Sequence, residues 1–305
     1  MVERTALTPE RILRRLEWRV IRRLDGRLQG DYRTLFRGTG IDVVDLREYQ
    51  PGDDLRHVDW NVTARTDVPH VREYLEDREV TAWLLLDRSA SMDFGPVERR
   101  KHLVMTEVAA TVAQLLSRSG NRVGAVLFGS DVEEVVPPAS GRNQVLRIIA
   151  RLLEPNEPPP AARKPGPPGA TDLSLPLRAT VGIARRRSLV VVVSDFISTP
   201  GWERPLGLLA RRHDVVALQV TDRHEFDLPA VGMIYVEDPE TGEQIFVDTD
   251  DAAFARRLRA AADERQAALT DAVRSADADL FTIATDEDLV RALARVAELR
   301  RRRRR

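Results

Sequence analysis

The stretch "AWLLLDRSASM", residues 82–92, decides which fold and which site we predict for this chain. Its first five residues are uncharged, which is typical of a short strand covered on both faces of a parallel sheet. The strand ends in Asp87, and two hydroxyl side chains follow at Ser89 and Ser91. Because residues i and i+2 of an extended turn face the same point, both hydroxyls can point where the carboxylate points.

Predicted strands and helices alternate through the rest of the chain. This alternation indicates an α/β protein with a doubly wound, mostly parallel sheet. A hairpin over 231–247 is expected at the edge of that sheet, and the proline-rich segment 154–170 is expected to form a surface loop, either a lid or a tether. The predicted strands are 82–86, 122–128, 188–194, 214–220 and 280–284, and the predicted helices are 99–117, 143–153, 171–186, 202–212, 251–275 and 287–299.

The chain divides into four predicted parts. These are a basic amphipathic helix in 1–26, a small β-rich subdomain in 27–80, the α/β domain in 81–299 and a basic tail in 300–305. In the first helix, apolar residues recur at helical spacing and arginines occupy the rest of the wheel. We expect it to lie on its own domain with the basic face in solvent; a helix that binds a membrane surface or a partner is the alternative.

Composition limits the classes of protein and the location. The chain has 305 residues, 43% of them apolar, and a formal net charge of −1, as in an ordinary globular protein. Cysteine is absent, which excludes disulfides, thiolate zinc sites and a cysteine nucleophile, and agrees with a cytoplasmic location. No window approaches the roughly 20 apolar residues of a membrane span. We therefore expect a cytoplasmic protein without a transmembrane segment, for which peripheral membrane contact stays open.

Oxygen-bearing side chains follow several predicted strands. Ligands of open α/β sheets bind at the carboxyl ends of the strands, where Asp87 and Asp195 each end a buried strand and Thr171 enters a helix. Carboxylate and hydroxyl oxygens suit a hard divalent cation, Mg²⁺ first, with Mn²⁺ or Ca²⁺ as alternatives. Two carboxylates offset the charge of the ion, and one coordination position then remains that an acidic side chain of another molecule could fill. A purely structural role is the alternative, because Asp-x-Ser-x-Ser also occurs in caps and turns.

This set of residues resembles a known metal site. Asp87, Ser89, Ser91, Thr171 and Asp195 are similar to the metal-ion-dependent adhesion site (MIDAS) of von Willebrand factor A domains. The resemblance implies that the serines and the threonine bind the ion, that the aspartates act directly or through water, and that a partner's Glu or Asp is the sixth ligand. It also implies a von Willebrand A-like fold for the α/β domain.

A second resemblance covers roughly residues 27–250. The strings "DLREYQPGDDLRHVDWNVTAR" (45–65), "VREYLEDREVTAWLLLDRSASMDFG" (71–95) and "LPAVGMIYVEDPETGE" (228–243) resemble the bacterial family called domain of unknown function 58. Many members carry membrane helices ahead of this region, unlike this chain. Genes of the family commonly neighbour those of MoxR-type AAA+ ATPases. The resemblance therefore implies a partner or adaptor of such an ATPase.

The string over 45–65 carries both signs of charge within a short span. We expect a self-satisfying network of ion pairs and hydrogen bonds that docks the subdomain onto the sheet, with a partner-binding surface as the alternative. The residues concerned are Arg47, Glu48, Asp53, Asp54, Arg56, Asp59, Trp60 and Arg65.

Three functions compete. The first is a metal-dependent adaptor that binds a client protein or the ATPase through an exposed Asp or Glu. The second is a metal-dependent phosphohydrolase, but such enzymes need a carboxylate two residues after the first aspartate, where this chain has Ser89. The third is a nucleic-acid or anionic-membrane binder that uses the basic ends. Since Arg300–Arg305 lacks interleaved aromatics, we expect a solvated tail and no specific nucleic-acid binding.

Overall fold

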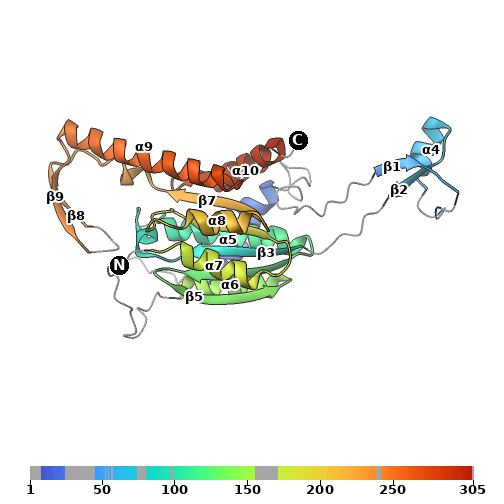
Figure 1. The fold of residues 1–305 in the computed structure, drawn as a ribbon, viewed down its shortest axis with the longest axis horizontal. Coiled ribbons are helices and arrows are strands. Elements are labelled where there is room, and N and C mark those ends of the chain that lie inside the picture. The colour runs from blue at the N-terminus through green and yellow to red at the C-terminus, as the bar shows by residue number, and fades with distance from the viewer. Residues whose placement is uncertain are drawn as a thin grey trace.

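The structure, a computed structural model, describes residues 8–24, 45–51, 53, 55, 58–73, 80–96, 99–154, 171–237 and 242–303. Its centre is a six-stranded sheet in the order β10-β7-β6-β3-β4-β5 (Figure 1). All neighbouring strands run parallel except β5, which is antiparallel to β4. This architecture confirms the predicted α/β class. The strands are β3 Thr81–Asp87, β4 Arg122–Phe128, β5 Val132–Ala139, β6 Leu189–Ser194, β7 Asp214–Thr221 and β10 Asp279–Ala284.

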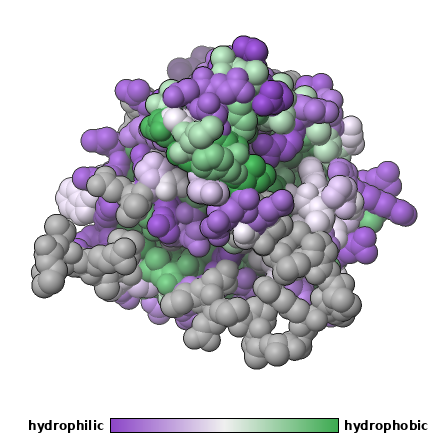
Figure 2. Space-filling model, turned by 90° about the vertical axis from the view of Figure 1, so that its left-hand side faces the viewer, coloured by the Kyte–Doolittle hydropathy of each residue, from purple (hydrophilic) through white to green (hydrophobic). Residues whose placement is uncertain are grey.

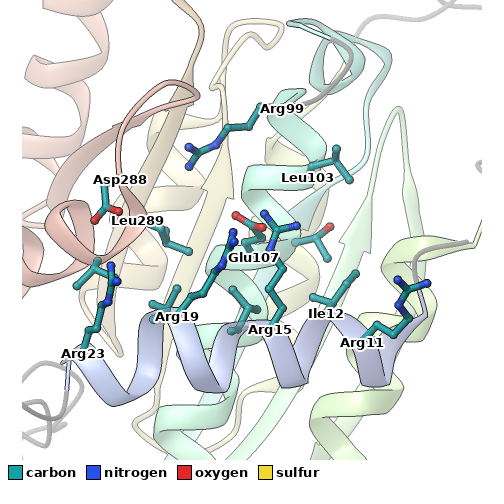
Figure 3. Close-up of a pocket in the computed structure, with 14 residues that line it drawn as sticks. Arg11, Ile12, Arg15, Arg19, Arg23, Arg99, Leu103, Glu107, Asp288 and Leu289 are labelled. Atoms are coloured by element: carbon teal, nitrogen blue, oxygen red, sulfur yellow. The ribbon is translucent and has the colours of Figure 1, made fainter. Parts of the chain in front are cut away.

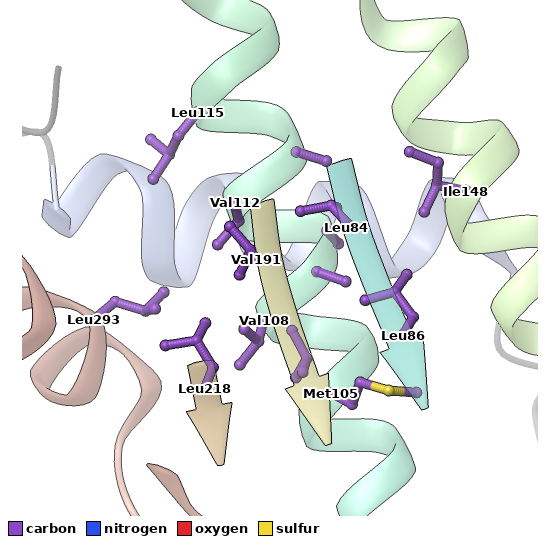
Figure 4. Close-up of a cluster of buried hydrophobic side chains, with 14 of the residues drawn as sticks. Leu84, Leu86, Met105, Val108, Val112, Leu115, Ile148, Val191, Leu218 and Leu293 are labelled. Carbon is purple, nitrogen blue, oxygen red and sulfur yellow. The ribbon is translucent and has the colours of Figure 1, made fainter. Parts of the chain in front are cut away.

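Helices cover both faces of the sheet, and each face has its own hydrophobic core. Side chains of β3 alternate between the two cores: Leu84 and Leu86 join the core under α5, whereas Trp83 and Leu85 join the core under α7 and α8. Figure 4 shows the first of these cores between β3 and α5. Burial on both faces explains the uncharged strand sequence. The helices are α5 Lys101–Arg118, α6 Arg142–Leu153, α7 Ser174–Ile183, α8 Glu203–Ala210, α9 Ala252–Ser275 and α10 Leu289–Arg303.

The order of the strands creates one switch point. The chain passes from β3 to β4 and β5 on one side, and then returns through α6 and α7 to β6 on the other side of β3. Leu86 of β3 lies opposite Val193 of β6, so the two strands end together. The loops that leave their carboxyl ends therefore diverge and open a crevice, which is where open α/β sheets bind ligands.

The N-terminal helix packs on the domain, as expected. It consists of α1 Pro9–Leu16 and a π-helical segment η1 Glu17–Ile21, and it continues to residue 24. Thr8 caps its start, and Pro9 occupies the first turn. Its buried side chains, among them Leu13 and Ile21, belong to the core that also contains α5, α6 and α10. The burial confirms that this helix lies on its own domain.

One strand prediction needs correction, and one strand was missed. The expected hairpin exists as β8 Met233–Glu237 and β9 Gln244–Asp248, but it forms a separate two-stranded sheet, because β10 takes the edge beside β7. The other edge strand, β5, was not predicted. Its sequence "VEEVVPPA" contains Pro137 and Pro138, which an edge strand tolerates because it lacks a second neighbour that needs its N–H groups.

The predicted β-rich subdomain contains a helix as well. Strands β1 Asp45–Glu48 and β2 His70–Glu73 pair antiparallel, and α4 Trp60–Thr66 lies between them in sequence. Asp59 precedes α4 and accepts a hydrogen bond from the Val62 amide (3.2 Å), which explains why the helix begins there. We refer to β1, α4 and β2 as the signature unit.

Arg300 does not belong to a solvated tail, contrary to the expectation from the sequence, whereas Arg302 and Arg303 are exposed. Helix α10 extends to Arg303, and Arg300 is 1% exposed. Its guanidinium contacts Asp214 (2.5 Å) and Asp279 (3.1 Å), which begin β7 and β10. These two carboxylates at the amino edge of the sheet need a cation, and Arg300 supplies it. No helix of the described residues is long and apolar enough to cross a membrane.

We expect Arg300→Met to lower the free energy of unfolding by about 3 kcal/mol, because Asp214 and Asp279 both lose a buried guanidinium, although Arg303 still pairs with Asp279. Arg302→Met is the matched control, since Arg302 is largely exposed and its ion pair within the described part of the chain is with Glu298. The control should stay within about 0.5 kcal/mol of wild type. Urea denaturation measures both, and equal effects of the two substitutions would show that the Arg300 pairs are dispensable.

Candidate functional site

Asp87 is the centre of the site. It is the last residue of β3 and fully buried. The hydroxyl of Ser194, the last residue of β6, donates to Asp87 Oδ2 (2.5 Å), and the Ser89 amide donates to Oδ1 (2.9 Å). Donors on both oxygens, one from the end of β6 and one from the turn after β3, fix the orientation of this carboxylate.

The two predicted serines lie together. Ser89 and Ser91 are buried, and their Oγ atoms are 3.0 Å apart. The chain makes a single 3-10 turn, η3 Ala90–Asp93, directly after Ser89. The two hydroxyls lie together, but Ser91 belongs to this 3-10 turn and not to the extended turn from which the prediction was made.

Asp195 lies near enough to Asp87 to repel it. It follows β6 directly, is 5% exposed, and its Oδ1 accepts a hydrogen bond from the Ile197 amide (2.9 Å). Burial, and then the charge of Asp195, raise the pKa of Asp87 from the ordinary 3.8 to about 7, against the hydrogen bonds from Ser194 and Ser89. Two buried carboxylates that repel each other form a site that a divalent cation would stabilise.

Thr171 belongs to the same edge of the sheet. It is fully buried, and its carbonyl oxygen accepts hydrogen bonds from the Thr199 amide (2.9 Å) and the Ser198 hydroxyl (3.2 Å). Both donors lie in the loop that follows β6. The structure therefore brings the third loop beside the loop that carries Asp195. The segment 154–170 was expected to be a lid or a tether, and all of it except Glu154 falls outside the described residues.

Sequence reasoning missed Lys101. This lysine is the first residue of α5 and is fully buried. Its Nζ lies 2.6 Å from Asp195 Oδ2 and also contacts Glu225 Oε1. Burial lowers the pKa of Lys101, but the charges and hydrogen bonds of Asp195 and Glu225 outweigh it and raise the pKa above its ordinary value. A permanent cation therefore already pairs with one of the two central carboxylates.

Glu225 comes from a fourth loop, after β7. It is the last residue of the 3-10 turn η4 Arg223–Glu225, and its Oε2 accepts a hydrogen bond from the Asp222 amide (3.2 Å).

One signal in the sequence could have pointed to the pair of Lys101 and Glu225. The chain has only two lysines among many arginines, so a lysine at residue 101 indicates a place that takes a compact ammonium and excludes a guanidinium.

The donor set fits a hard cation only if the hydroxyls take part. Among the described residues, no group of three or more His, Cys, Asp or Glu side chains could hold a metal ion. Asp87 and Asp195 supply two carboxylates, and the remaining oxygens come from Ser89, Ser91 and Thr171. These are the oxygen ligands that Mg²⁺ accepts, and soft metals would find neither thiolate nor imidazole here.

The signature unit holds part of the predicted network inside itself. Arg47 forms two hydrogen bonds of 2.7 Å with the carboxylate of Asp53, whose Oδ2 also accepts the Gln50 amide (2.8 Å). The Arg47 hydrogen bonds, followed by that of Gln50, lower the pKa of Asp53 to about 2. This pair closes the turn after β1.

The expected docking of this unit onto the sheet is not seen among the described residues. Figure 1 shows the signature unit apart from the sheet. Trp60, one of the residues expected to dock the unit, is 69% exposed, and Glu48 and Arg65 are exposed too. Asp59 is buried within the unit, whereas Asp54 and Arg56 lie outside the described residues.

The fold is that of a doubly wound α/β protein, and oxygen-bearing side chains gather at its switch point. The family model "Protein of unknown function DUF58" matches residues 45–268. The chain belongs to this family, as the resemblance in the sequence indicated.

Several proteins are similar to this chain. "Uncharacterized protein Rv1480" of Mycobacterium tuberculosis and "Uncharacterized protein Mb1516" of Mycobacterium bovis are each 38% identical over 294 residues, 95% of this chain and 89% of theirs. Among solved structures, the conserved hypothetical protein BatB from Bacteroides thetaiotaomicron is 15% identical, covers 73% of this chain and 99% of its own, and has a TM-score of 0.45. The VWA domain of SpRpn10 is 14% identical, covers 71% and 94%, and has a TM-score of 0.39.

We expect Lys101→Met to destabilise the protein by about 3 kcal/mol, because Asp195 and Glu225 would lose their shared cation in a buried place. Glu225→Gln is the comparison, since it leaves the Lys101–Asp195 pair intact and should cost less. The double variant should be less destabilised than the sum of the two, because the residues interact. Chemical denaturation in chelator measures all three, and additive effects would contradict the coupling.

The raised pKa of Asp87 predicts how stability changes with pH. Between pH about 4 and about 7 the folded protein retains a proton that the unfolded chain has released, so stability in chelator should fall by about 3 kcal/mol as the pH rises through this window. Asp87→Asn should flatten this dependence. Urea unfolding at several pH values measures the slope, and an unchanged slope in Asp87→Asn would assign it to another group.

Proposed function

We propose that the protein is a Mg²⁺-dependent interaction module that binds an acidic side chain of a partner protein at the carboxyl edge of its sheet. The observation that carries the proposal is that Asp87 and Asp195 are both buried where β3 and β6 end side by side, with the buried hydroxyls of Ser89 and Ser91 3.0 Å apart directly after Asp87. Asp87, Ser89, Ser91 and Thr171 would hold the ion. Bound there, Mg²⁺ would supply positive charge and an open coordination position for an outside carboxylate.

Lys101 supports a division of roles between the two aspartates. Asp195 already receives the ammonium of Lys101 and the Ile197 amide, one on each carboxylate oxygen. Asp87 receives a hydroxyl and an amide and has no cation among its described hydrogen-bond and ion-pair partners. We therefore infer that Asp87 carries most of the charge compensation of the ion, while Asp195 acts through water and positions Lys101.

The partner we propose is a MoxR-type AAA+ ATPase, or a client that such an ATPase remodels. This part of the proposal rests on the family to which the chain belongs, together with a site that suits an exposed Asp or Glu. The described residues favour neither alternative function. Ser89 stands where a phosphohydrolase would need its second carboxylate, and Arg300 and Arg303 of the basic tail already pair with aspartates.

Substitution of a proposed metal-binding residue tests Mg²⁺ binding directly. We expect Mg²⁺ at millimolar concentration to raise the melting temperature of the wild-type protein, since an ion that binds only the folded state stabilises it. Asp87→Ala and Ser91→Ala should abolish this increase. Asp93→Ala is the matched control, because its carboxylate is exposed in the same turn and should leave the Mg²⁺ response unchanged.

A pulldown tests the partner. Immobilised protein should retain the MoxR-type ATPase of the same organism in Mg²⁺ and release it in chelator, and the Asp87→Ala variant should retain none. Retention that is equal with and without chelator would refute the metal-mediated contact, even if Mg²⁺ binds.

A further inference from the structure

The β8–β9 hairpin exposes apolar side chains on one of its faces. Met233, Tyr235 and Phe246 are 65%, 71% and 53% exposed, and the rings of Tyr235 and Phe246 lie 4.8 Å apart across the two strands. Figure 2 shows this end of the molecule, where hydrophobic residues gather at the surface among hydrophilic ones. An apolar surface of this kind indicates contact with another molecule.

The opposite face of the hairpin is apolar as well. Ile234, Val236 and Val247 are only partly buried there, and Ile245 is 56% exposed. An isolated two-stranded hairpin is marginally stable in water and needs further packing. The described part of the chain covers neither face of the hairpin completely, so both faces lack a full packing partner within it.

The hairpin is also strongly acidic. Residues 227–251, which contain both strands and their flanks, hold eight Asp or Glu residues and no Lys, Arg or His. Glu237, at the end of β8, and Asp250, shortly after β9, are both exposed. The complementary surface must therefore be basic at its rim and apolar at its centre.

The N-terminal helix borders a groove with these properties. The groove has a volume of about 650 Å³ and lies between this helix, α5 and α10 (Figure 3). Apolar side chains such as Leu16, Leu103 and Leu289 line it. Its charged lining has five arginines and only two acids: Arg11, Arg15, Arg19, Arg23, Arg99, Glu107 and Asp288.

Four of these arginines form a regular row. Arg11, Arg15, Arg19 and Arg23 recur every four residues, are exposed, and form no ion pair with any described residue. At 1.5 Å per residue the row spans about 18 Å. A strand of five residues, such as β8 or β9, spans about 17 Å. The groove and the hairpin therefore agree in length as well as in charge.

The hairpin cannot reach the groove of its own chain. Figure 1 shows the hairpin at one end of the molecule, beyond the start of α9, and the N-terminal helix, in dark blue, near the end of α10. We propose that the β8–β9 hairpin of one molecule binds the arginine-lined groove of a second copy. Such a contact joins two different surfaces head to tail, so each molecule keeps one free hairpin and one free groove.

Sedimentation velocity in chelator tests this contact without any bound metal. We expect wild-type protein to self-associate as its concentration rises to about 100 µM, and to do so more weakly at high salt, because the contact is largely electrostatic. The groove variant Arg15→Glu/Arg19→Glu and the hairpin variant Glu237→Lys/Asp250→Lys should each associate at least about tenfold more weakly. Protein that stays monomeric throughout this range overturns the proposal.

Mixing the two variants gives the sharpest outcome. The groove variant retains a native hairpin and the hairpin variant retains a native groove, so an equimolar mixture should regain association that neither shows alone. Arg14→Glu/Arg22→Glu is the matched control, because both residues are exposed on the same helix and neither lines the groove. A control as weak as the groove variant, or a mixture that stays monomeric, would refute the head-to-tail contact. Tyr235→Ser should weaken association without any change of charge.

Discussion

The repulsion between two buried carboxylates at the switch point is the constraint on which the rest of the site depends. Asp87 and Asp195 meet because β6 returns to lie beside β3. Burial makes their negative charges costly. The surrounding atoms offset that cost: hydroxyl and amide donors bind Asp87, and the ammonium of Lys101 binds Asp195. A cation that also binds a partner's acidic side chain would further offset the negative charges of Asp87 and Asp195. The stability of the fold and the function we propose would therefore depend on the same two carboxylates.

Most of the sheet could be predicted from the sequence, because buried parallel strands and amphipathic helices have distinct patterns. The uncharged runs before Asp87 and Asp195 mark β3 and β6 within one or two residues. Where prediction failed, tertiary context decided. The prolines of β5 argue against a strand until an edge position is known. The pattern of 231–247 predicts a hairpin, but it cannot tell which edge, if any, the hairpin joins.

The candidate site could be predicted where one short string supplies its residues, and could not where the start of a helix meets a loop far away in the sequence. Asp87, Ser89 and Ser91 lie in one short string, and the structure brings Asp195 and Thr171 to the same edge. Lys101 and Glu225 are 124 residues apart and meet only through folding, so spacing gives no signal for them. The arginines at the chain's two ends looked alike in sequence. Those of the first helix are exposed, whereas Arg300 is buried against two aspartates.

Helix α5 gives the two halves of the molecule a common rigid body. Its first residue, Lys101, pairs with the acids at the edge of the sheet, and Glu107, less than two turns further on, lines the arginine groove together with Arg99 just ahead of the helix. Helix α5 therefore contacts both the carboxyl edge of the sheet and the arginine-lined groove, so a single rigid element joins the candidate site to a second surface of the molecule.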